Sequence, residues 1–389
     1  MGLPITHRPS RPSWWNQLSS LPVWKLFLAY HAALAGLIVA NALWLRRRAA
    51  RPAPPTAFPT LTVIIPARNE EANLQRLLPT LLAQRYPSFD VLVYDDASED
   101  GTSGVVRRLG DGRVRLLRGA GPPPGWVGKV HALAEASAEA RGELIAFLDA
   151  DAELRHPDAL AHLVARFTAL PGEAALSGLT HMVGGGTLLV SAIPYAFFSS
   201  LPLPLVPRLR LPLCSALNGQ FWMIARATYE RLQPHRRHPD EVLEDLVIGR
   251  YLMRHGVISW MEDLQDDVAV HMYGSLGEAW LGLRKNLYLA MGGSPLLAGP
   301  FFVLFVCGYL VPLAVSPWFL LSLFVLKGLS DRVARQPVRA TLFAPLTYVL
   351  LAALALDSAV AHWTGTAQWK GRRIVRGACR AARHRAGPP

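Results

Sequence analysis

The sequence contains little cysteine and little charge. Its three cysteines, Cys214, Cys307 and Cys379, are too few and too scattered for a disulfide framework or a zinc site, and this usage is typical of a chain that works in a reducing compartment. Only 17% of the 389 residues are charged, whereas 51% are apolar. This apolar content excludes an intrinsically disordered chain and exceeds that of most soluble domains.

Acidic residues are missing from both ends of the chain. Residues 1–60 and residues 363–389 each hold seven basic residues and no acid, so the net charge of +12 leaves −2 for the segment between them. A nucleic-acid-binding domain carries its positive charge on a folded surface, whereas here the charge lies at the termini. We therefore expect no nucleic-acid partner.

Two common nucleotide-binding signatures are also absent. The chain has no G-x-x-x-x-G-K-[S/T] motif, and its run of three glycines at 184–186 does not follow a strand as the dinucleotide fingerprint requires. Lys129, however, follows a glycine at the start of an alanine-rich helix expected over residues 130–140, where its ammonium and backbone N–H groups could meet a phosphate. A plain helix N-terminus is the other interpretation.

Long hydrophobic runs are present, and the first lies near the N-terminus. Residues 21–45 carry one charge, Lys25, and as a helix they would be about 38 Å long, enough to cross a bilayer core of about 30 Å. The arginines that follow favour the cytoplasm for this end, and they also disfavour a cleaved signal peptide. We expect a tail over residues 1–20, an anchor over 21–45 and a basic, proline-rich linker over 46–60.

Two further apolar runs lie near the C-terminus, at residues 295–326 and 340–362. Each is long enough to cross, and the first must tilt, kink at Pro312 or Pro317, or form a re-entrant pair. The basic tail over 363–389 favours the cytoplasm, which requires an even number of crossings and places the basic loop from Lys327 to Arg339 outside. These features predict a multi-pass protein of the cytoplasmic membrane, with a transmembrane region over 295–362 and a cytoplasmic catalytic domain.

The central residues 61–290 alternate between short apolar runs and helical stretches, as in α/β folds. Strands are expected over residues 61–65, 91–94 and 144–148, and a helix with leucines 74, 77, 78 and 81 on one face follows the first strand. Polar or acidic residues follow each of the three strands. Since ligands bind at the carboxyl ends of strands in doubly wound sheets, these residues predict one shared site.

Asp149 and Asp151 are the candidate metal ligands. Side chains at i and i+2 after a strand point to the same side, so this pair can hold one hard divalent cation such as Mg²⁺ or Mn²⁺ and leave room for phosphate oxygens. A metal that bridges a diphosphate would stabilise a leaving nucleoside diphosphate. Solvated turn acids are the other interpretation, which the preceding apolar strand disfavours.

Two further groups have candidate roles. Asp245, with Glu244, begins a predicted helix; it is either a favourable partner of the helix dipole or the base that removes a proton from an attacking hydroxyl. Arg284 and Lys285 precede the long apolar run, where they could hold a leaving diphosphate or form an ordinary juxtamembrane pair.

Residues 182–207 contain no charged residue although they lie inside the catalytic domain. Their prolines oppose one spanning helix, because each removes a backbone donor. We expect short helices at the membrane interface, with Tyr195, Phe197 and Phe198 facing lipid, in an acceptor segment over residues 182–225. An internal core segment is the alternative.

The order of motifs resembles the family 2 glycosyltransferases with a GT-A fold, over roughly residues 61–288. The motifs are TVIIPARNEE (62–71), VLVYDDASEDGT (91–102), GWVGKVHAL (125–133), LIAFLDADAEL (144–154), NGQFWMIAR (218–226) and EVLEDLVIGRYLMRHG (241–256). The runs PPPGWVGK (122–129) and VHMYGSLGEAWLGLRKN (270–286) are similar to the membrane-bound branch that glycosylates carotenoid, hopanoid or other isoprenoid lipids.

The resemblance implies a role for each matching position. The nucleoside pocket would comprise Pro66, Ala67, Glu70 and either Asp95 or Asp96. Lys129 would lie near the diphosphate, and Asp149 and Asp151 would hold the metal. Asp245 would be the base. Processive polysaccharide synthases carry Q-x-x-R-W, whereas residues 281–286 read LGLRKN, with neither the Gln nor the Trp. Long-chain polymerisation is therefore not expected, although Arg284 could retain the basic role.

The sequence thus predicts an inverting, metal-dependent glycosyltransferase with a GT-A domain between transmembrane helices. It would move one sugar from a nucleoside diphosphate sugar, UDP-glucose by family frequency alone, to a membrane lipid. Sugar transfer to polyprenyl phosphate or to a growing glycan is the alternative within the class. The alternative outside the enzyme class is a non-catalytic nucleotide-binding membrane protein. Such a protein would be expected to have lost some of the acidic positions, whereas all of them are present.

Overall fold

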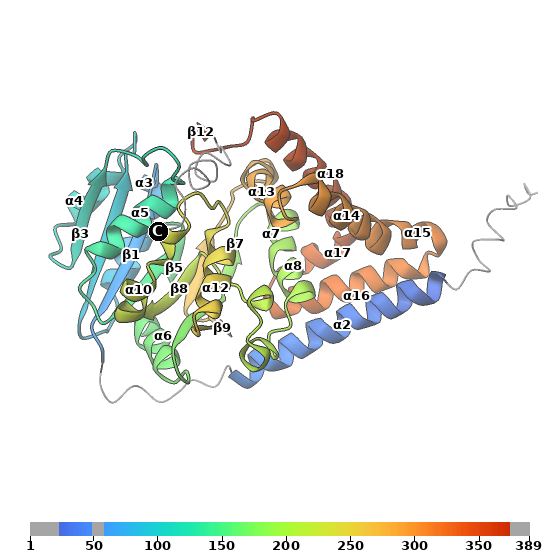
Figure 1. Cartoon of the computed structure of the whole chain (residues 1–389), viewed down its shortest axis with the longest axis horizontal. Coiled ribbons are helices and arrows are strands. Elements are labelled where there is room, and N and C mark those ends of the chain that lie inside the picture. Colours follow the sequence, from blue (N-terminus) through green and yellow to red (C-terminus); the bar gives the residue numbers. More distant parts are fainter. Residues whose placement is uncertain (1–22, 49–57, 374–389) are drawn as a thin grey trace, which may run out of the picture.

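The computed structural model describes residues 23–48 and 58–373 (Figure 1). The predicted N-terminal tail, residues 49–57 of the linker and residues 374–389 of the basic tail lie outside the described residues. The strands are β1 (Leu61–Ala67), β2 (Phe89–Asp96), β3 (Val114–Gly119), β4 (Leu144–Leu148), β5 (Ala152–Leu154), β6 (Ala174–Leu179), β7 (His181–Val183), β8 (Phe221–Ala225), β9 (Ile258–Asp263), β10 (Val268–His271), β11 (Gln368–Trp369) and β12 (Arg372–Arg373).

Helices connect these strands and extend beyond them. They are α2 (Val23–Arg48), α3 (Glu71–Leu82), α4 (Thr102–Leu109), α5 (Gly128–Ala138), α6 (Ala159–Thr168), α7 (Thr187–Val190), α8 (Ala192–Ser200), α9 (Val206–Leu209), α10 (Arg226–Leu232), α11 (Pro234–Arg237), α12 (Glu244–Arg254), α13 (Leu276–Ala290), α14 (Pro295–Phe305), α15 (Val311–Val315), α16 (Trp318–Val333), α17 (Val338–Leu342) and α18 (Ala344–Trp363). A 3₁₀ turn, η1 (Pro212–Cys214), follows α9, and a π-helical turn, η2 (Val306–Leu310), joins α14 to α15.

The central domain, for which the sequence predicts a catalytic role, is built on a seven-stranded sheet in the order β3-β2-β1-β4-β8-β6-β9. The first four of these strands are parallel, whereas β8 is antiparallel to both β4 and β6. The three strands predicted from apolar runs are β1, β2 and β4, so their prediction is confirmed. A smaller sheet, β5-β10-β7, lies beside the end of β4.

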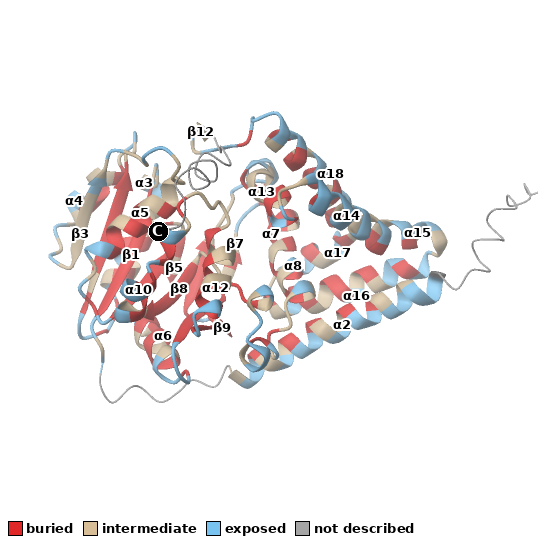
Figure 2. Cartoon of the chain, in the orientation of Figure 1, coloured by how far each residue is buried: buried red, intermediate tan, exposed pale blue. Residues whose placement is uncertain are grey.

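Alternating residues of β1 pack into two different cores, as the pleat of a strand requires. Val63 and Ile65 contact a cluster that includes the four predicted leucines of α3, all of them buried. Ile64 contacts a second cluster that includes residues of α5 and α12. Helices therefore cover both faces of the sheet, and its strands are largely buried except for the edge strand β3 (Figure 2).

Three described helical stretches are long and apolar enough to cross a membrane: Trp24–Arg48, Pro295–Val315 and Ala344–Trp363. The long run predicted over residues 295–326 is not one helix, because it passes through η2 and breaks at Ser316 and Pro317 before α16 begins. α16 then lies along α2 (Figure 1). Many side chains of α2, α14 and α15 are exposed (Figure 2), although they are apolar.

The structure corrects the predicted position of the basic loop that follows α16. Arg335 forms ion pairs with Asp266, and Arg339 donates to the hydroxyl of Thr187 at 3.1 Å. The side chain of Gln265 also donates to the carbonyl oxygen of Val333 at 2.9 Å. The loop therefore lies against the catalytic domain and does not face outward on the opposite side, because its arginines pair with acids and hydroxyls of that domain.

The structure also corrects part of the predicted interfacial segment. Residues 182–207 do form short helices, yet Tyr195 and Phe198 on α8 do not face lipid. Phe198 is 0% exposed, and both side chains belong to a core cluster shared with α2 and α16. The side chain of Asn41 on α2 completes this packing by donating to the carbonyl oxygens of Phe198 and Leu201 at 3.0 and 2.8 Å.

Exposed leucines occur later in the same segment, after α8 ends. Leu205, Leu209, Leu211 and Leu213 are among the exposed large hydrophobic residues, and Leu213 is 75% exposed. Leu203, which precedes them, and Val206, which lies among them, line a small cavity together with Trp44 near the end of α2. We refer to residues 205–213 as the leucine segment.

Candidate active site

Three parallel strands end at one edge of the large sheet, and each delivers residues that the sequence marked. β1 ends at Ala67 and leads into Glu70, β2 ends in Asp96, and β4 leads into Asp149. The pairing of Ala67 with Asp95 and of Ile64 with Phe147 aligns these ends. The first turns of α5 and α12 bring further charged groups to the same edge, and Lys285 approaches from the second half of α13.

Asp149 and Asp151 lie on opposite sides of Ala150 in the turn between β4 and β5. The backbone N–H of Asp149 donates to the carbonyl oxygen of Gln220 at 3.1 Å, and its own carbonyl oxygen accepts from Ala152 at 3.1 Å. The carbonyl oxygen of Asp151 accepts from the N–H of His271 on β10 at 2.8 Å. These backbone bonds fix the turn, so the two carboxylates do not depend on each other for their placement.

The Asp151 carboxylate fits a divalent cation. Its Oδ1 atom is buried and has no hydrogen-bond partner among the described residues. Burial, together with the nearby charges of Asp149 and Glu70, raises the pKa of Asp151 to about 8. A buried, unpartnered carboxylate oxygen beside other carboxylates is stabilised by a hard cation, for which oxygen ligands are preferred.

Lys129 is the central cation of the site. From the first turn of α5, its Nζ atom lies 2.7 Å from Asp149 and 3.1 Å from Glu244. Burial works against its charge, but Asp149 and Glu244 outweigh this effect and hold the pKa of Lys129 above its ordinary value. The lysine therefore stays charged and links the β4 turn to the start of α12.

Asp245 is held at the N-terminus of α12 by two backbone groups. Its Oδ2 atom accepts from the N–H of Gly219 at 3.0 Å, and its Oδ1 atom accepts from Leu246 at 2.9 Å. Burial and the neighbouring charge of Glu244 raise the pKa of Asp245 to about 6. A side chain at Gly219 would lie 3.1 Å from the Asp245 carboxylate and 3.4 Å from Lys129, so this glycine permits their close approach.

The predicted nucleoside residues divide into two groups. Asp95 is used locally, because its carboxylate accepts from the N–H of Ser98 at 2.9 Å and from the hydroxyl of Ser103. Asp96 instead pairs with Arg372, and its Oδ1 atom is buried with no partner among the described residues. Both carboxylate oxygens of Asp95 therefore accept hydrogen bonds, whereas Asp96 has a carboxylate oxygen that can bind a ligand.

The remaining members of the predicted nucleoside group line the approach to Asp96. Pro66 is half-buried and Ala67 is buried at the end of β1. The carboxylate of Glu70 accepts from Asn73 at 2.6 Å and pairs with Lys370. Arg68 donates to the carbonyl oxygens of Asp96 and Ala97 at 2.9 and 2.7 Å, which joins the ends of β1 and β2.

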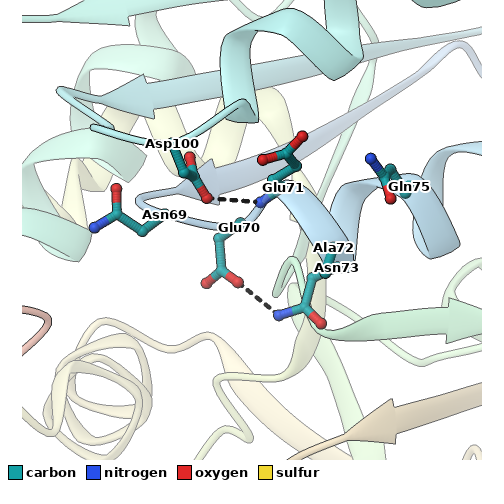
Figure 3. A pocket seen from close by; sticks show the side chains of 7 residues that line it. All are labelled: Asn69, Glu70, Glu71, Ala72, Asn73, Gln75 and Asp100. Atoms are coloured by element: carbon teal, nitrogen blue, oxygen red, sulfur yellow. Dashed lines mark hydrogen bonds between the residues drawn. The ribbon is translucent and has the colours of Figure 1, made fainter.

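An open cavity of about 420 Å³ lies at the N-terminus of α3 (Figure 3). It is lined by Asn69, Glu70, Glu71, Ala72, Asn73, Gln75 and Asp100. Glu70 is its one member from the predicted site, and the figure shows its carboxylate bonded to Asn73. The cavity is therefore beside the acidic cluster and does not contain Asp149, Asp151 or Asp245.

Arg284 and Lys285 on α13 have different surroundings. The Nε atom of Arg284 lies 3.0 Å from the Asp357 carboxylate on α18, so this side chain joins the two helices. Lys285 is close enough to Glu244, Asp149 and Asp245 to feel their charges, but burial dominates and lowers its pKa to about 8. Of the two, Lys285 is the basic group of α13 that the structure places near the acids.

Sequence reasoning missed three residues that the structure brings to this edge. His271 lies beside Asp151 through its backbone and pairs with Glu153 through its side chain at 2.7 Å. Lys370 and Arg372, which the sequence assigned to a basic tail, contact Glu70 and Asp96. His271 lies within the motif at residues 270–286 and could have been found there. No pattern in the neighbouring sequence indicated a role for Lys370 or Arg372.

Residues 62–232 match the family model described as glycosyl transferase family 2. This part of the chain is a family 2 glycosyltransferase domain. The fold agrees, since the mannosyltransferase PcManGT from Pyrobaculum calidifontis, solved with GDP-Man and Mn²⁺, is similar with a TM-score of 0.52 and 22% identity, over 90% of this chain and 100% of that one. The glycosyltransferase domain thus has the predicted GT-A fold.

Two curated relatives of the chain share a name. The chain is 38% identical over 117 residues to the 4,4′-diaponeurosporenoate glycosyltransferase of Staphylococcus aureus strain bovine RF122 / ET3-1. It is 39% identical over 116 residues to the protein of the same name from strain MRSA252. Each match covers 30% of this chain, and the chain spans 30% of the length of each relative.

Proposed function

We propose that this protein is an inverting, metal-dependent glycosyltransferase that moves one sugar from a nucleoside diphosphate sugar to a hydroxyl of an isoprenoid-type membrane lipid. The observation that carries the proposal is the convergence of Asp149, Asp151, Lys129 and Asp245 at the carboxyl edge of the sheet. PcManGT was solved with GDP-Man and Mn²⁺, which supports the donor class and the cation. The names of the curated relatives support a carotenoid-type acceptor.

Asp149 and Asp151 would hold Mg²⁺ or Mn²⁺, which would neutralise the charge that develops on the leaving diphosphate. The N-terminus of α5 serves the same diphosphate, because no side chain caps its first backbone N–H groups and Lys129 belongs to its first turn. Lys285, from α13, adds a second ammonium to this side of the site. Asp96 offers its unpartnered Oδ1 atom to the nucleoside.

Asp245 would act as the base. The acceptor hydroxyl must lose its proton as its oxygen attacks the anomeric carbon, and a carboxylate with a raised pKa accepts that proton readily near neutral pH. The hydrogen bonds from Gly219 and Leu246 fix this carboxylate in place. One base and one direct displacement invert the anomeric configuration, because the nucleophile enters opposite the leaving group.

The acceptor would reach the site from the membrane. We propose that α2 and residues 295–363 hold the protein in the cytoplasmic membrane, with the catalytic domain on the cytoplasmic side. The exposed leucines 205–213 then lie on the part of the catalytic domain that packs against the end of α2, where they can insert between lipids. UDP-glucose is the donor we propose first, by family frequency alone.

The proposal is tested with full-length protein in lipid nanodiscs. UDP-glucose or GDP-mannose is supplied with Mn²⁺ and a lipid extract that contains carotenoids, and the products are identified by mass spectrometry. We expect one hexose on one lipid class and none after EDTA treatment. If the product is instead a hexosyl polyprenyl phosphate or an extended glycan, the acceptor is not a carotenoid-type lipid. The alternative within the glycosyltransferase class would then hold.

A matched pair of variants tests the role of Asp151 in this experiment. Asp151→Asn should lower the product roughly a hundredfold or more, whereas Asp158→Asn, which removes the charge of a partly exposed aspartate paired with Arg85, should leave it unchanged. A wild-type protein that binds a donor but forms no glycolipid would favour the non-catalytic, nucleotide-binding alternative.

A further inference from the structure

Residues 368–373, which follow α18, form a hairpin over the donor side of the candidate site. β11 and β12 pair through Gln368 with Arg373 and Trp369 with Arg372, which leaves Lys370 and Gly371 as a two-residue turn. Both turn residues have positive φ, 46° and 78°, as a type I′ turn requires. Lysine rarely adopts positive φ, so Lys370 occupies the turn despite the backbone preference of this residue type.

The hairpin meets the catalytic domain at the ends of β1 and β2. The Nζ atom of Lys370 contacts the Glu70 carboxylate and donates to the carbonyl oxygen of Arg68 at 2.8 Å. Arg372 pairs with the Asp96 carboxylate, and its second Nη atom donates to the Asp96 carbonyl oxygen at 3.3 Å. Two cations of the hairpin therefore lie on two carboxylates of the proposed donor site.

The absence of a side chain at Gly128 makes room for the guanidinium of Arg372. A Cβ atom at Gly128 would lie 2.9 Å from an Nη atom of Arg372 and 2.7 Å from Asp96. Gly128 opens α5, the helix whose N-terminus carries Lys129. Arg372 thus lies between the nucleoside carboxylate and the helix N-terminus that we assign to the diphosphate.

The hairpin is also held on its other side. Trp369 lies over Lys285, whose ammonium is 4.0 Å from the ring centroid. α18, which carries the hairpin, is joined to α13 by the hydroxyl of Ser358, which donates to the carbonyl oxygen of Arg284 and accepts from the N–H of Tyr288. The hairpin therefore has a fixed support and does not depend on its two ion pairs for its position.

We propose that Lys370 and Arg372 are donor-binding residues that contact the nucleoside diphosphate. This inference rests on the proposed function and extends its donor site to a segment about 300 residues away from Arg68 in sequence. With the donor bound, Lys370 exchanges the Glu70 carboxylate for a phosphate oxygen, and Arg372 stays beside Asp96 at the nucleoside. The proposal involves no covalent step.

The test compares nucleoside diphosphate affinities of full-length proteins in detergent. UDP and GDP are each titrated with Mn²⁺ into wild type and into the double variant Lys370→Asn, Arg372→Gln. Asparagine tolerates positive φ, so the variant removes the charges and keeps the turn. We expect the dissociation constant of the bound nucleotide to rise about tenfold or more, since two charge-assisted hydrogen bonds are lost.

A charge-matched control is available on the same domain. Arg231→Gln with Arg236→Gln removes two positive charges from exposed pairs with Glu173 and Glu135, and it should leave the dissociation constant unchanged. In wild type, the nucleotide with Mn²⁺ should also slow tryptic cleavage after Lys370 and Arg372.

Two results would overturn the inference. An unchanged dissociation constant in the double variant would make the hairpin a structural cover, and tighter binding with faster tryptic cleavage would make it a plug that the donor expels. A wild-type protein that binds neither nucleotide would remove the proposed function, and this inference with it. Binding in wild type with an unaffected double variant would remove only the inference.

Discussion

Asp151 and Asp245 are half-buried residues whose carboxyl pKa values are both raised, to about 8 and about 6, by desolvation first and by neighbouring carboxylates second. Their surroundings nevertheless differ. Asp245 accepts two backbone N–H bonds, whereas Oδ1 of Asp151 has no partner among the described residues. This difference agrees with the proposed roles. Asp245, as the base, is held in place by backbone hydrogen bonds, whereas Asp151, as a metal ligand, has an oxygen available to bind a cation.

The first prediction concerns Asp151. Asp151→Asn should leave the unfolding temperature near that of wild type and lower transfer roughly a hundredfold or more, because an amide retains the shape but not the charge that binds a hard cation. Calorimetric titration with Mn²⁺ and a transfer assay check both parts. Undiminished transfer by wild type in excess EDTA would contradict metal dependence.

The second prediction concerns Asp245. Asp245→Asn should retain donor binding while transfer falls about 10²- to 10⁴-fold, the typical effect of losing a general base. Calorimetry with the nucleoside diphosphate and a transfer assay measure the two quantities separately. Loss of donor binding as well would assign Asp245 to the nucleotide site.

The third prediction is the pH dependence that follows from the same carboxylate. A base must be unprotonated, and the raised pKa of Asp245 means that it takes up a proton as the pH falls through about 6. The charged groups that face it are Glu244, Lys129 and Lys285. Transfer at saturating donor should therefore increase between pH 5 and pH 7, and a profile that is flat across this range would point to another base.

At the scale of elements, α8 and the leucine segment differ in what their apolar side chains meet. α8 buries Phe198 against α2 and α16, whereas residues 205–213 expose four leucines. A helix that is apolar on all sides carries no sequence signal for which side faces lipid. The tertiary packing of α2 on α8 decides it, through Asn41 and the core cluster.

The fourth prediction uses this difference. Leu209→Asp with Leu213→Asp should keep metal-dependent hydrolysis of the sugar nucleotide and lower transfer to a lipid in nanodiscs, because a charge opposes insertion at the interface. Phe198→Asp should unfold the protein, because it places a charge in a closed core. Equal transfer by the leucine variant and wild type would show that the acceptor enters elsewhere.

At the scale of the whole molecule, the catalytic domain and α2 are joined by an ion network. Arg48, at the end of α2, lies 2.6 Å from Glu262, which also pairs with Arg166 at 3.1 Å. The Glu262 side chain is 4% exposed. Arg48 also lies over the ring of Trp260 at 4.4 Å, so the end of α2 is fixed against β9.

The fifth prediction is that Glu262→Ala lowers the free energy of unfolding by roughly 3–5 kcal/mol, since it leaves Arg166 buried with its charge poorly compensated. Arg46→Ala, at an exposed position on the same helix, is the control and should change little. Thermal unfolding in one detergent measures both. Equal unfolding temperatures for Glu262→Ala and wild type would mean that the network does not hold the two parts together.

The sequence by itself determined β1, β2 and β4, the helix that follows β1, the start of α12 and the acidic residues at the ends of these strands. These features depend on the periodicity of neighbouring side chains, so a short window of sequence contains their cause. The burial of leucines 74, 77, 78 and 81 in α3 follows from the same local rule.

Only the tertiary structure decided which groups meet across the chain. Lys370 contacts Glu70 across 300 residues of sequence, Lys285 approaches the acids while its neighbour Arg284 pairs with α18, and the arginines after α16 return to the catalytic domain. Each of these pairings depends on how apolar helices pack against the domain. Hydrophobic burial is non-directional, so side-chain contacts across the packed helices, and not sequence periodicity, select the partners.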